Sequence, residues 1–352
     1  MLKRTFLKSL LAGSMLMGLG TSFAFADAHT TFDGPKEGPK AAEGKTIVVL
    51  AGDLKNGGIL GVTNGVEEAA AKAGWTVRVL DGAGSVQGRT AAFGQAMALK
   101  PDGLIVNGFD AIEQQAALDQ VAAASIPMVS WHSGPKIGCD AQGGSFTNVS
   151  TDPMTVSEKA AEWAVTDAGG TPGVVIFTDS TYEIAIAKAD RIKETVEKMG
   201  GTVLEYVDTP IAETSNRMGP LTTSLLQKYG EKWTHALAIN DIYFDFMGPA
   251  LAAAGISGDG APKAVAAGDG SESAFQRIAT GQYQVITVAE PLNLQGWQLV
   301  DELNRAMQGE ACSGYVTTPA VIDAEAAKGM DGNTQFDPAN GYREAYSAIW
   351  GK

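Results

Sequence analysis

Polar side chains follow several apolar stretches of the chain, each at the point where the stretch ends. Asn107 comes directly after residues 104–106, and Asn240 and Asp241 come directly after residues 237–239. Other such positions hold Asp53, Asn56, Trp131, His132, Asp179, Tyr182, Asp269 and Glu290. Amides and carboxylates can each form two hydrogen bonds to neighbouring hydroxyl groups, and an aromatic face can cover the apolar side of a sugar ring. These residue types indicate recognition of a polyhydroxylated molecule.

A second interpretation applies to each position taken singly. Asp, Asn and Ser often follow a strand because their side chains cap the next helix. The set as a whole is harder to explain in this way, because Asn107 and Asn240 hold the same place in two successive parts of the chain. In open α/β sheets, ligands bind outside the carboxyl ends of the strands. We therefore expect these side chains to converge on one cleft.

Residues 45–74 show the unit that would position such side chains. Residues 46–51 are an apolar run rich in β-branched residues, and residues 52–58 are a polar loop rich in glycine. Apolar residues then recur at helical spacing up to residue 73, and Gly74 stands where a helix C-cap is expected. The pattern predicts a buried parallel strand, a loop and a helix.

The same unit recurs along the chain. Candidate strands begin near residues 47, 75, 104 and 128, about 24 to 29 residues apart, which is the length that a crossover with one helix requires. The second half predicts strand cores at 174–177, 203–206, 236–240, 264–267 and 285–288. Its predicted helices are 155–167, 185–199, 221–229, 245–254 and 271–280. The fold class is therefore α/β, with two doubly wound parallel-sheet domains.

Composition and the N-terminus indicate an exported globular protein. The chain has 352 residues, 45% of them hydrophobic, which suffices for two domain cores. Residues 1–26 have the parts of a cleavable signal peptide, and their apolar stretch falls short of the roughly 20 residues that span a membrane. Residues 27–44 are polar and are predicted to be a flexible leader. Without the signal the formal charge of −14 becomes −17, which makes nucleic acid a poor partner.

The two cysteines, Cys139 and Cys312, are far apart and not in metal-ligand spacing. An exported protein resides where disulfides persist, so one disulfide is possible, and two buried free thiols are the alternative. Nothing else in the sequence indicates a metal site, and no cofactor is expected.

Signals for catalysis are weak. His132 and His235 lack a zinc-site spacing, and no nucleophile elbow or Walker loop is present. Residues 82–88 resemble a dinucleotide fingerprint loosely, but the third glycine comes one residue late, so a turn is expected. The sequence predicts a protein that is not an enzyme. The competing hypothesis is a secreted carbohydrate-active enzyme that uses Asp241 and Asp269 for acid–base work.

Five stretches together resemble a known family: residues 65–70, 101–107, 126–129, 238–241 and 267–270, which read GVEEAA, PDGLIVN, IPMV, AIND and AGDG. The chain is similar, over roughly residues 45–325, to periplasmic solute-binding proteins of the type I class, which includes ribose- and galactose-binding proteins and serves ABC importers. The resemblance implies a type I periplasmic binding protein fold, with a multi-strand hinge near Asn148, Glu290 and Thr318. It implies a first lobe of residues 45–148 and 290–318, and a second lobe of residues 149–289 and 319–352.

By the same resemblance, a set of residues would contact sugar hydroxyls: Asn56, Asn107, His132, Asn240, Asp269 and Glu290. The chain departs from the family in three places. His132 and Ser133 replace an Asp-Arg pair, Asp190 stands where a cleft arginine is usual, and Gly58 and Ile59 replace an aromatic pair. Stacking on a ring would then come from Trp131 or Tyr182, and an acyclic polyol is a possible ligand.

The function implied is the substrate-binding component of an ABC importer in the periplasm. It would bind a monosaccharide or polyol between its lobes and deliver it to membrane permease subunits, as a monomer. The alternative within the same fold is a sensory protein that presents a ligand such as a signalling furanone to a receptor. The sequence does not separate transport from sensing.

Overall fold

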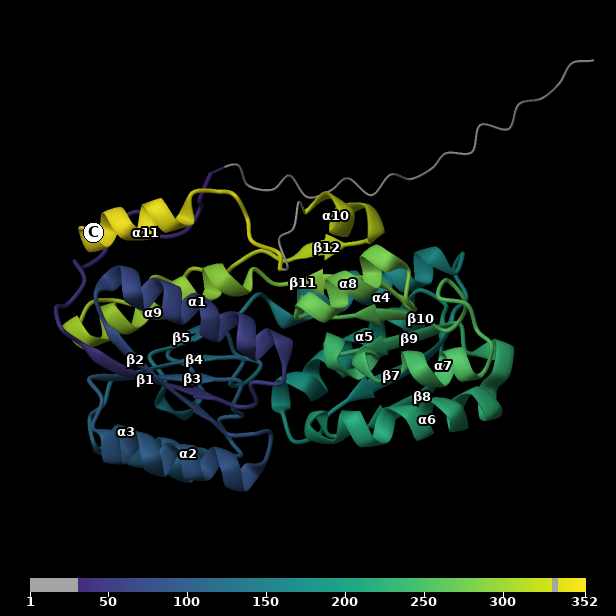
Figure 1. Ribbon diagram of the computed structural model, residues 1–352, viewed down its shortest axis with the longest axis horizontal. Helices are drawn as coiled ribbons and strands as arrows, with labels where there is room; N and C mark the ends of the chain where they lie inside the picture. Colours follow the sequence, from purple (N-terminus) through teal and green to yellow (C-terminus); the bar gives the residue numbers. More distant parts are fainter. Residues whose placement is uncertain (1–30, 331–334) are drawn as a thin grey trace, which may run out of the picture.

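The computed structural model describes residues 31–330 and 335–352 (Figure 1). The predicted signal peptide, residues 1–26, lies outside the described residues. Two lobes lie side by side, and each is built on one sheet with helices on both faces. No helix in the described part of the chain is both long and apolar enough to cross a membrane.

The first lobe contains a six-stranded sheet in the order β2-β1-β3-β4-β6-β5. The strands are parallel except for β5, which runs antiparallel to β6. The strands are β1 Thr46–Ala51, β2 Thr76–Asp81, β3 Gly103–Asn107, β4 Met128–Trp131, β5 Gly138–Cys139 and β6 Thr147–Val149. The helices of this lobe are α1 Gly57–Ala73, α2 Val86–Leu99, α3 Gln115–Ala123, α9 Leu292–Gln308 and α11 Tyr342–Trp350.

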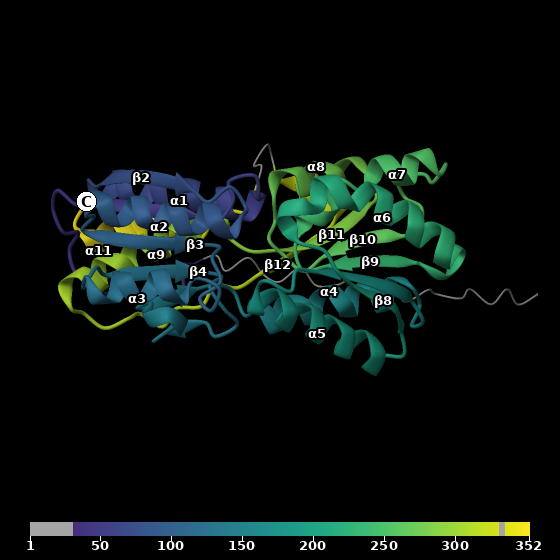
Figure 2. The ribbon, with the colours of Figure 1, turned by 90° about the horizontal axis from the view of Figure 1, so that it is seen from below.

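The second lobe repeats the arrangement, with the sheet order β12-β11-β10-β9-β7-β8 and only β12 antiparallel. Its strands are β7 Gly173–Thr178, β8 Thr202–Asp208, β9 His235–Ala238, β10 Lys263–Ala266, β11 Gln284–Ala289 and β12 Ala320–Ile322. Its helices are α4 Pro153–Asp167, α5 Glu183–Lys198, α6 Thr214–Tyr229, α7 Gly248–Ala253, α8 Glu272–Thr280 and α10 Ala324–Gly329. Figure 2 shows α4 and α5 below this sheet and α6, α7 and α8 above it. The predicted fold class is confirmed.

Burial explains why these segments fold as they do. All residues of β3 and β7 are buried, as expected for central strands that are covered on both faces. In α1 the apolar residues at helical spacing face the core, Asn56 caps the N-terminus, and Gly74 ends the helix in the left-handed conformation with φ 82°. The helices α1 and α9 approach closely, since a Cβ atom on Gly296 would lie 2.5 Å from the carbonyl carbon of Gly65.

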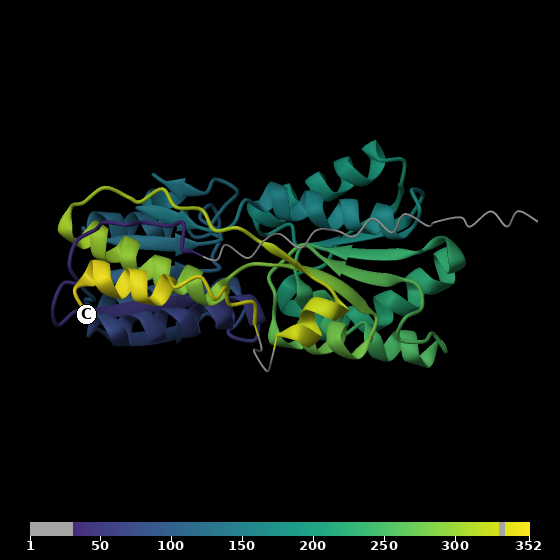
Figure 3. The same cartoon turned by 90° about the horizontal axis from the view of Figure 1, so that it is seen from above.

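The chain crosses between the lobes after β6, after β11 and again between α9 and β12. Thr151 on the first crossing pairs with Thr317 on the third in an isolated parallel bridge. Figure 3 shows the yellow and yellow-green crossing segments running between the two lobes. These three crossings connect the two lobes covalently.

The C-terminal helix differs from expectation. Residues 319–352 were predicted to belong to the second lobe, and β12 and α10 do lie there. In contrast, α11 packs on α9 of the first lobe, where Trp350 stacks on Trp297 with ring centroids 5.4 Å apart. The Nε1 of Trp350 also donates to Asp301 at 2.8 Å. The aromatic face of α11 is completed by a partner about 50 residues away, which local sequence does not reveal.

The predicted flexible leader also packs on the first lobe in the part that is described. Phe32 is 4% exposed and contacts the ring of Tyr346 of α11, with centroids 5.1 Å apart. The amide of Ala42 donates to Asn304 of α9 at 3.0 Å. Residues 31–44 are therefore held by side chains far along the chain, although they have no apolar periodicity of their own.

Two further differences are local. The helix α6 begins at Thr214, although the prediction placed its start at residue 221. Pro220 lies inside α6, and proline usually ends or begins a helix, so the sequence suggested a boundary that does not exist. The cysteines, which the sequence left open, are joined: Cys139 in β5 and Cys312 after α9 form a disulfide.

Candidate functional site

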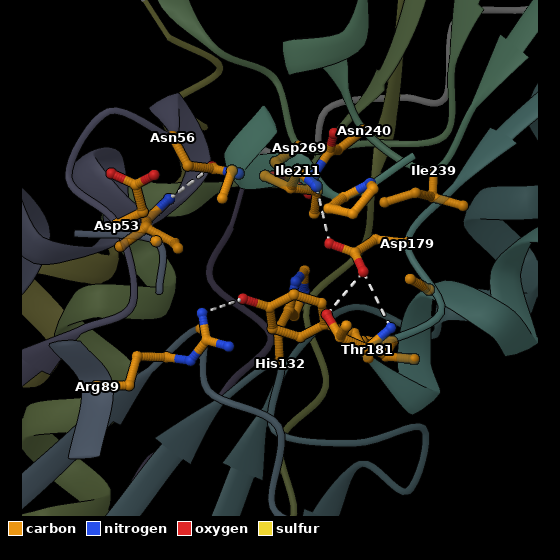
Figure 4. Close-up of a pocket in the computed structure, with 18 of the residues that line it drawn as sticks. Asp53, Asn56, Arg89, His132, Asp179, Thr181, Ile211, Ile239, Asn240 and Asp269 are labelled. Carbon is orange, nitrogen blue, oxygen red and sulfur yellow. Dashed lines mark hydrogen bonds between the residues drawn. The ribbon is translucent and has the colours of Figure 1, made fainter. Parts of the chain in front are cut away.

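A cavity of about 320 Å³ lies between the lobes, where the carboxyl ends of both sheets meet (Figure 4). Both lobes contribute to its wall, as the topology requires. Its lining from the first lobe includes Asp53, Asn56, Ile59, Val86, Arg89, Trp131 and His132. Its lining from the second lobe includes Asp179, Tyr182, Ile184, Lys188, Ile211, Ile239, Asn240 and Asp269. A cavity of this size falls within the range of small-molecule sites.

Three buried polar groups of the second lobe have hydrogen-bonding capacity to spare. Lys188 on α5 is 3% exposed and Asp269 is 5% exposed, and neither side chain has a hydrogen-bond partner within the described residues. The Oδ1 of the buried Asn240 is also without a partner there. Burial raises the pKa of Asp269 to about 6, against the opposing charges of Lys188 and His132. Because buried polar groups are normally paired, these groups are suited to a polar ligand.

Two other carboxylates of this lobe are occupied by backbone amides. Asp179 accepts hydrogen bonds from the amide of Thr181 at 2.9 Å and from the amide of Ile211 at 2.8 Å. Asp241 accepts from the amides of Gly270 and Ser271 at 2.8 and 3.1 Å. These carboxylates shape the loops around the cavity. Asp241 does not line the cavity, so the hypothetical catalytic pair Asp241 and Asp269 does not face one space.

The first lobe contributes Asn56 and Arg89. The Oδ1 of Asn56 accepts from the amides of Gly58 and Ile59, which begins α1 next to the cavity. Arg89 on α2 is 2% exposed and binds both carboxylate oxygens of Glu113, at 2.5 and 2.7 Å. Its Nη1 donates to the hydroxyl of Tyr182 in the second lobe at 3.0 Å. The guanidinium therefore links the two lobes at the cavity.

His132 is held in an unusual conformation at the wall of the cavity. Its φ is 51°, in the left-handed region, and its ring stacks on Trp131 with centroids 3.5 Å apart. The Nε1 of Trp131 donates to Gln295 at 2.8 Å, so the indole is fixed from α9. One face of Trp131 is thus covered by His132, which leaves it less able to stack on a ligand than the sequence suggested.

Glu290 lies beneath His132, in the second crossing between the lobes. It is 1% exposed and accepts from the amide of Thr151 at 3.2 Å and from Gln295 at 2.9 Å. The Nε2 of His132 lies 3.2 Å from its Oε2. Burial raises the pKa of Glu290, but the charge and hydrogen bond of His132 outweigh that effect and lower the pKa to about 2. Glu290 is therefore an ionised group in the second crossing between the lobes.

Six of the nine ligand-binding residues predicted from the sequence line the cavity: Asn56, Trp131, His132, Tyr182, Asn240 and Asp269. Two others are buried behind it. Glu290 joins the crossings as described, and Asn107 is fully buried, with its Nδ2 donating to the carbonyl of Ile59 and to Thr63 at 2.9 Å each. Asn107 thus holds α1 on the sheet. Whether the six touch a ligand stays a prediction.

Asp190 does not face the cavity. It lies on the exposed side of α5, where its Oδ1 accepts from the hydroxyl of Tyr206 at 3.1 Å. The cavity side of α5 carries Ile184, Ala185 and Lys188, at the spacing of one helical turn. Asp190 comes two residues after Lys188, which turns it about 200° around the helix axis. The prediction was wrong because it located the right part of α5 but not the side of the helix that faces the cavity.

The prediction also missed Arg89 and Lys188, the two buried cations of the cavity. Lys188 could have been found from helical spacing, because it follows Ile184 by four residues in a helix whose apolar face is clear. Nothing in the local sequence distinguishes Arg89 from a surface arginine. It is buried by contact with Tyr182 of the other lobe and by pairing with Glu113.

The site also contains three possible metal ligands. One ligand atom from each of His132, Asp269 and Glu290 lies within 4.8 Å of the others. However, the charge of Lys188 acts on both carboxyls: it opposes the rise in the pKa of Asp269 and helps to lower the pKa of Glu290. A positive charge of the protein already balances these carboxylates, so the arrangement does not favour a metal.

A family model described as a periplasmic binding protein domain matches residues 47–311. The chain belongs to this family. The resemblance inferred from the sequence is confirmed, and the family consists of extracytoplasmic binding proteins. No curated protein sequence matches the chain significantly.

Solved structures show the same fold. A solute-binding protein of an ABC transporter from Agrobacterium vitis, bound with α-D-tagatopyranose, is 19% identical, with a TM-score of 0.72 and coverage of 82% of this chain and 97% of that one. A second from the same organism, with bound allitol, is 20% identical with a TM-score of 0.71, covering 81% and 97%. An ABC sugar transporter subunit from Rhodobacter sphaeroides is 20% identical with a TM-score of 0.68, covering 80% and 99%. At these identities the likeness establishes the fold.

Proposed function

We propose that this periplasmic binding protein takes up one neutral monosaccharide or polyol in the cavity between its lobes. The observation that carries the proposal is the group of buried polar atoms on Lys188, Asn240 and Asp269, which have no hydrogen-bond partner among residues 31–330 and 335–352. A hydroxyl group both donates and accepts, so adjacent hydroxyls can accept from the ammonium and donate to the carboxylate at the same time. The similar solved structures that hold α-D-tagatopyranose and allitol support this class of ligand.

The charge balance of the cavity favours a neutral ligand. The cations Arg89 and Lys188 share the cavity wall with the carboxylates of Asp53, Asp179, Glu213 and Asp269. Arg89 is already paired with Glu113, and Asp179 accepts from backbone amides, so neither sign of charge is left in large excess. An anionic ligand would be attracted by the cations but repelled by the carboxylates. A cationic ligand would be attracted by the carboxylates but repelled by the cations. Isoleucine side chains from both lobes complete the wall and can cover the carbon chain of a sugar or polyol.

Binding would be coupled to closure of the lobes. Residues of both lobes line the cavity, so a ligand that contacts both stabilises the closed arrangement by its differential contacts. In this proposal the closed protein then delivers the ligand to ABC permease subunits at the membrane, after export directed by residues 1–26. It acts as a monomer without a cofactor, and it does not transform its ligand.

A thermal-shift panel tests the proposal. The protein is unfolded, refolded free of ligand and screened against D-tagatose, allitol, D-ribose, D-galactose, glycerol, amino acids and nucleosides. A ligand at about 100 times its dissociation constant adds roughly 2.7 kcal/mol to the stability of the native state, which raises the melting temperature measurably. A shift with a sugar or polyol supports the proposal. Shifts confined to amino acids or nucleosides, or none with any compound, would contradict it.

A further inference from the structure

The helix α5 of the second lobe begins without a cap from its own lobe. Tyr182 stands at the N-cap position and its side chain makes no capping hydrogen bond. The amide of Glu183 donates instead to the Oδ2 of Asp110, at 2.8 Å, and Asp110 belongs to the first lobe. A carboxylate at a helix N-terminus satisfies an unpaired amide and interacts favourably with the helix dipole. Here that carboxylate reaches the helix across the cleft.

Asp110 is held in place by its own lobe. Its Oδ1 accepts from the amides of Ile112 and Glu113, at 2.9 and 3.0 Å, while its Oδ2 faces α5. The side chain is 3% exposed. Each oxygen therefore serves one lobe, and the first pair of hydrogen bonds orients the carboxylate for the second contact.

Further contacts between the lobes surround Tyr182 and Glu183 at the start of α5. Gln142 donates to the carboxylate of Glu183 at 3.1 Å, and Arg89 donates to the hydroxyl of Tyr182 at 3.0 Å. We call the contacts of Asp110, Gln142 and Arg89 with Tyr182 and Glu183 the α5 clasp. Asp110, Gln142 and Glu183 do not line the cavity. Their part of the clasp can form whatever the cavity contains.

We propose that Asp110 is a positioning residue for ligand binding, which caps α5 across the cleft and thereby stabilises the closed arrangement of the lobes. The same helix carries Lys188 one and a half turns further on, so the contact places that ammonium opposite the first lobe. When the lobes separate, the carboxylate oxygen and the amide of Glu183 return to water. The clasp therefore raises the closed population in the absence of ligand and lowers the cost of closure on binding.

The substitution Asp110→Asn separates the two halves of this role. The asparagine oxygen can still accept from Ile112 and Glu113, but the amide nitrogen then faces the amide of Glu183, donor against donor. The matched control is Asp323→Asn. Asp323 caps α10 within the second lobe by accepting from the amides of Glu325 and Ala326, and it makes no hydrogen bond to the first lobe within the described residues.

The first measurement is small-angle X-ray scattering of the ligand-free proteins. We expect the wild type to contain a compact population that agrees with the closed structure, and D110N to have a larger radius of gyration, with D323N like the wild type. A wild-type profile without the compact form would overturn the proposal. So would identical profiles of D110N and wild type, or an equal expansion in D323N. Should D110N fail to fold, Gln142→Ala removes a neighbouring clasp contact, and an unchanged profile of Q142A would also contradict it.

The second measurement is isothermal titration with D-tagatose and allitol, and this part rests on the proposed function. Loss of one charge-assisted contact in the closed state should weaken binding about tenfold in D110N, with no change in D323N. Equal affinities of D110N and wild type would overturn the role in binding. Absence of heat with every protein would contradict the ligand class proposed above, while the scattering result would still decide the role of Asp110 in closure.

Discussion

Lys188 places a positive charge in the wall of the cavity, with no hydrogen-bond partner in the described part of the chain. We expect Lys188→Met to weaken binding of the sugar or polyol roughly 10- to 100-fold, because a hydrogen bond from a charged donor contributes about 1.5–3 kcal/mol. Isothermal titration measures the loss. Arg191→Met is the control, since Arg191 pairs with Glu158 and Glu194 on the outer side of α5. Similar losses in both variants would show that α5, rather than its ammonium, is responsible.

Asp269 makes binding depend on pH. Its pKa is raised to about 6 by burial, so the carboxylate that would accept from ligand hydroxyls is lost as the pH falls through 6. The affinity of the wild type should be level above pH 7 and should fall toward tenfold per pH unit below 6. Titrations at pH 5, 6, 7 and 8 measure this. Asp269→Asn should bind more weakly with a level profile, and a level profile in the wild type would refute the role of the carboxylate.

The sequence alone predicts some residues of the cavity but not the role of each side chain. Asn56, Asn240 and Asp269 lie in the loops that follow β1, β9 and β10, so strand positions alone bring them to the cleft. Asn107 is the last residue of β3, and its side chain is used to hold α1. That difference depends on which direction the side chain points at the last residue of a strand, and neighbouring residue types do not determine it.

At the scale of elements, α9 contains a carboxylate with a perturbed pKa outside the cleft. Glu302 is 1% exposed and accepts from the amide and hydroxyl of Ser313, on the chain segment that follows Cys312. Burial raises its pKa to about 7 from an ordinary value of 4.5. The folded protein therefore keeps a proton that the unfolded chain loses between these two values. Stability from this group is present below pH 4.5 and is lost as the pH rises to 7.

We expect Glu302→Gln to remove that dependence, because glutamine stays neutral and can still accept from Ser313. The melting temperature of E302Q minus that of the wild type should become more positive from pH 5 to pH 8. The change corresponds to about 2 kcal/mol in the free energy of unfolding. Differential scanning calorimetry across this range measures it. Glu325→Gln, on the exposed helix α10, is the control and should show no such trend. A constant difference between E302Q and wild type would contradict the raised pKa.

Elements differ in how well their own sequence predicts them. The strands β1, β3 and β7 are apolar runs bounded by polar or glycine residues, and burial on both faces requires nothing from elsewhere. The helix α11 is amphipathic, but its partner is α9, and no local signal indicates which lobe it covers. The crossing that returns the chain to the first lobe was therefore not predictable, whereas the alternation of strands and helices was.

At the scale of the whole molecule, one disulfide joins an edge strand of the first lobe to the third crossing between the lobes. Cys139 lies in the edge strand β5, and Cys312 lies in the segment that runs from α9 to the third crossing. The two residues are 173 positions apart. A cross-link over so long a loop restricts the unfolded chain strongly, and chain-entropy estimates for such loops reach about 4–5 kcal/mol.

We expect Cys139→Ser together with Cys312→Ser to lower the free energy of unfolding by about 3 kcal/mol and to leave the fold intact, because both lobes keep their cores. Urea denaturation without reductant measures the loss. Dithiothreitol should destabilise the wild type by a similar amount and the double variant not at all. A wild type whose stability in urea is unchanged by reductant would contradict this account.

The disulfide holds the third crossing against β5, and Thr151 and Thr317 join the first and third crossings. Removal of the disulfide should therefore also broaden the ligand-free scattering profile toward more open forms.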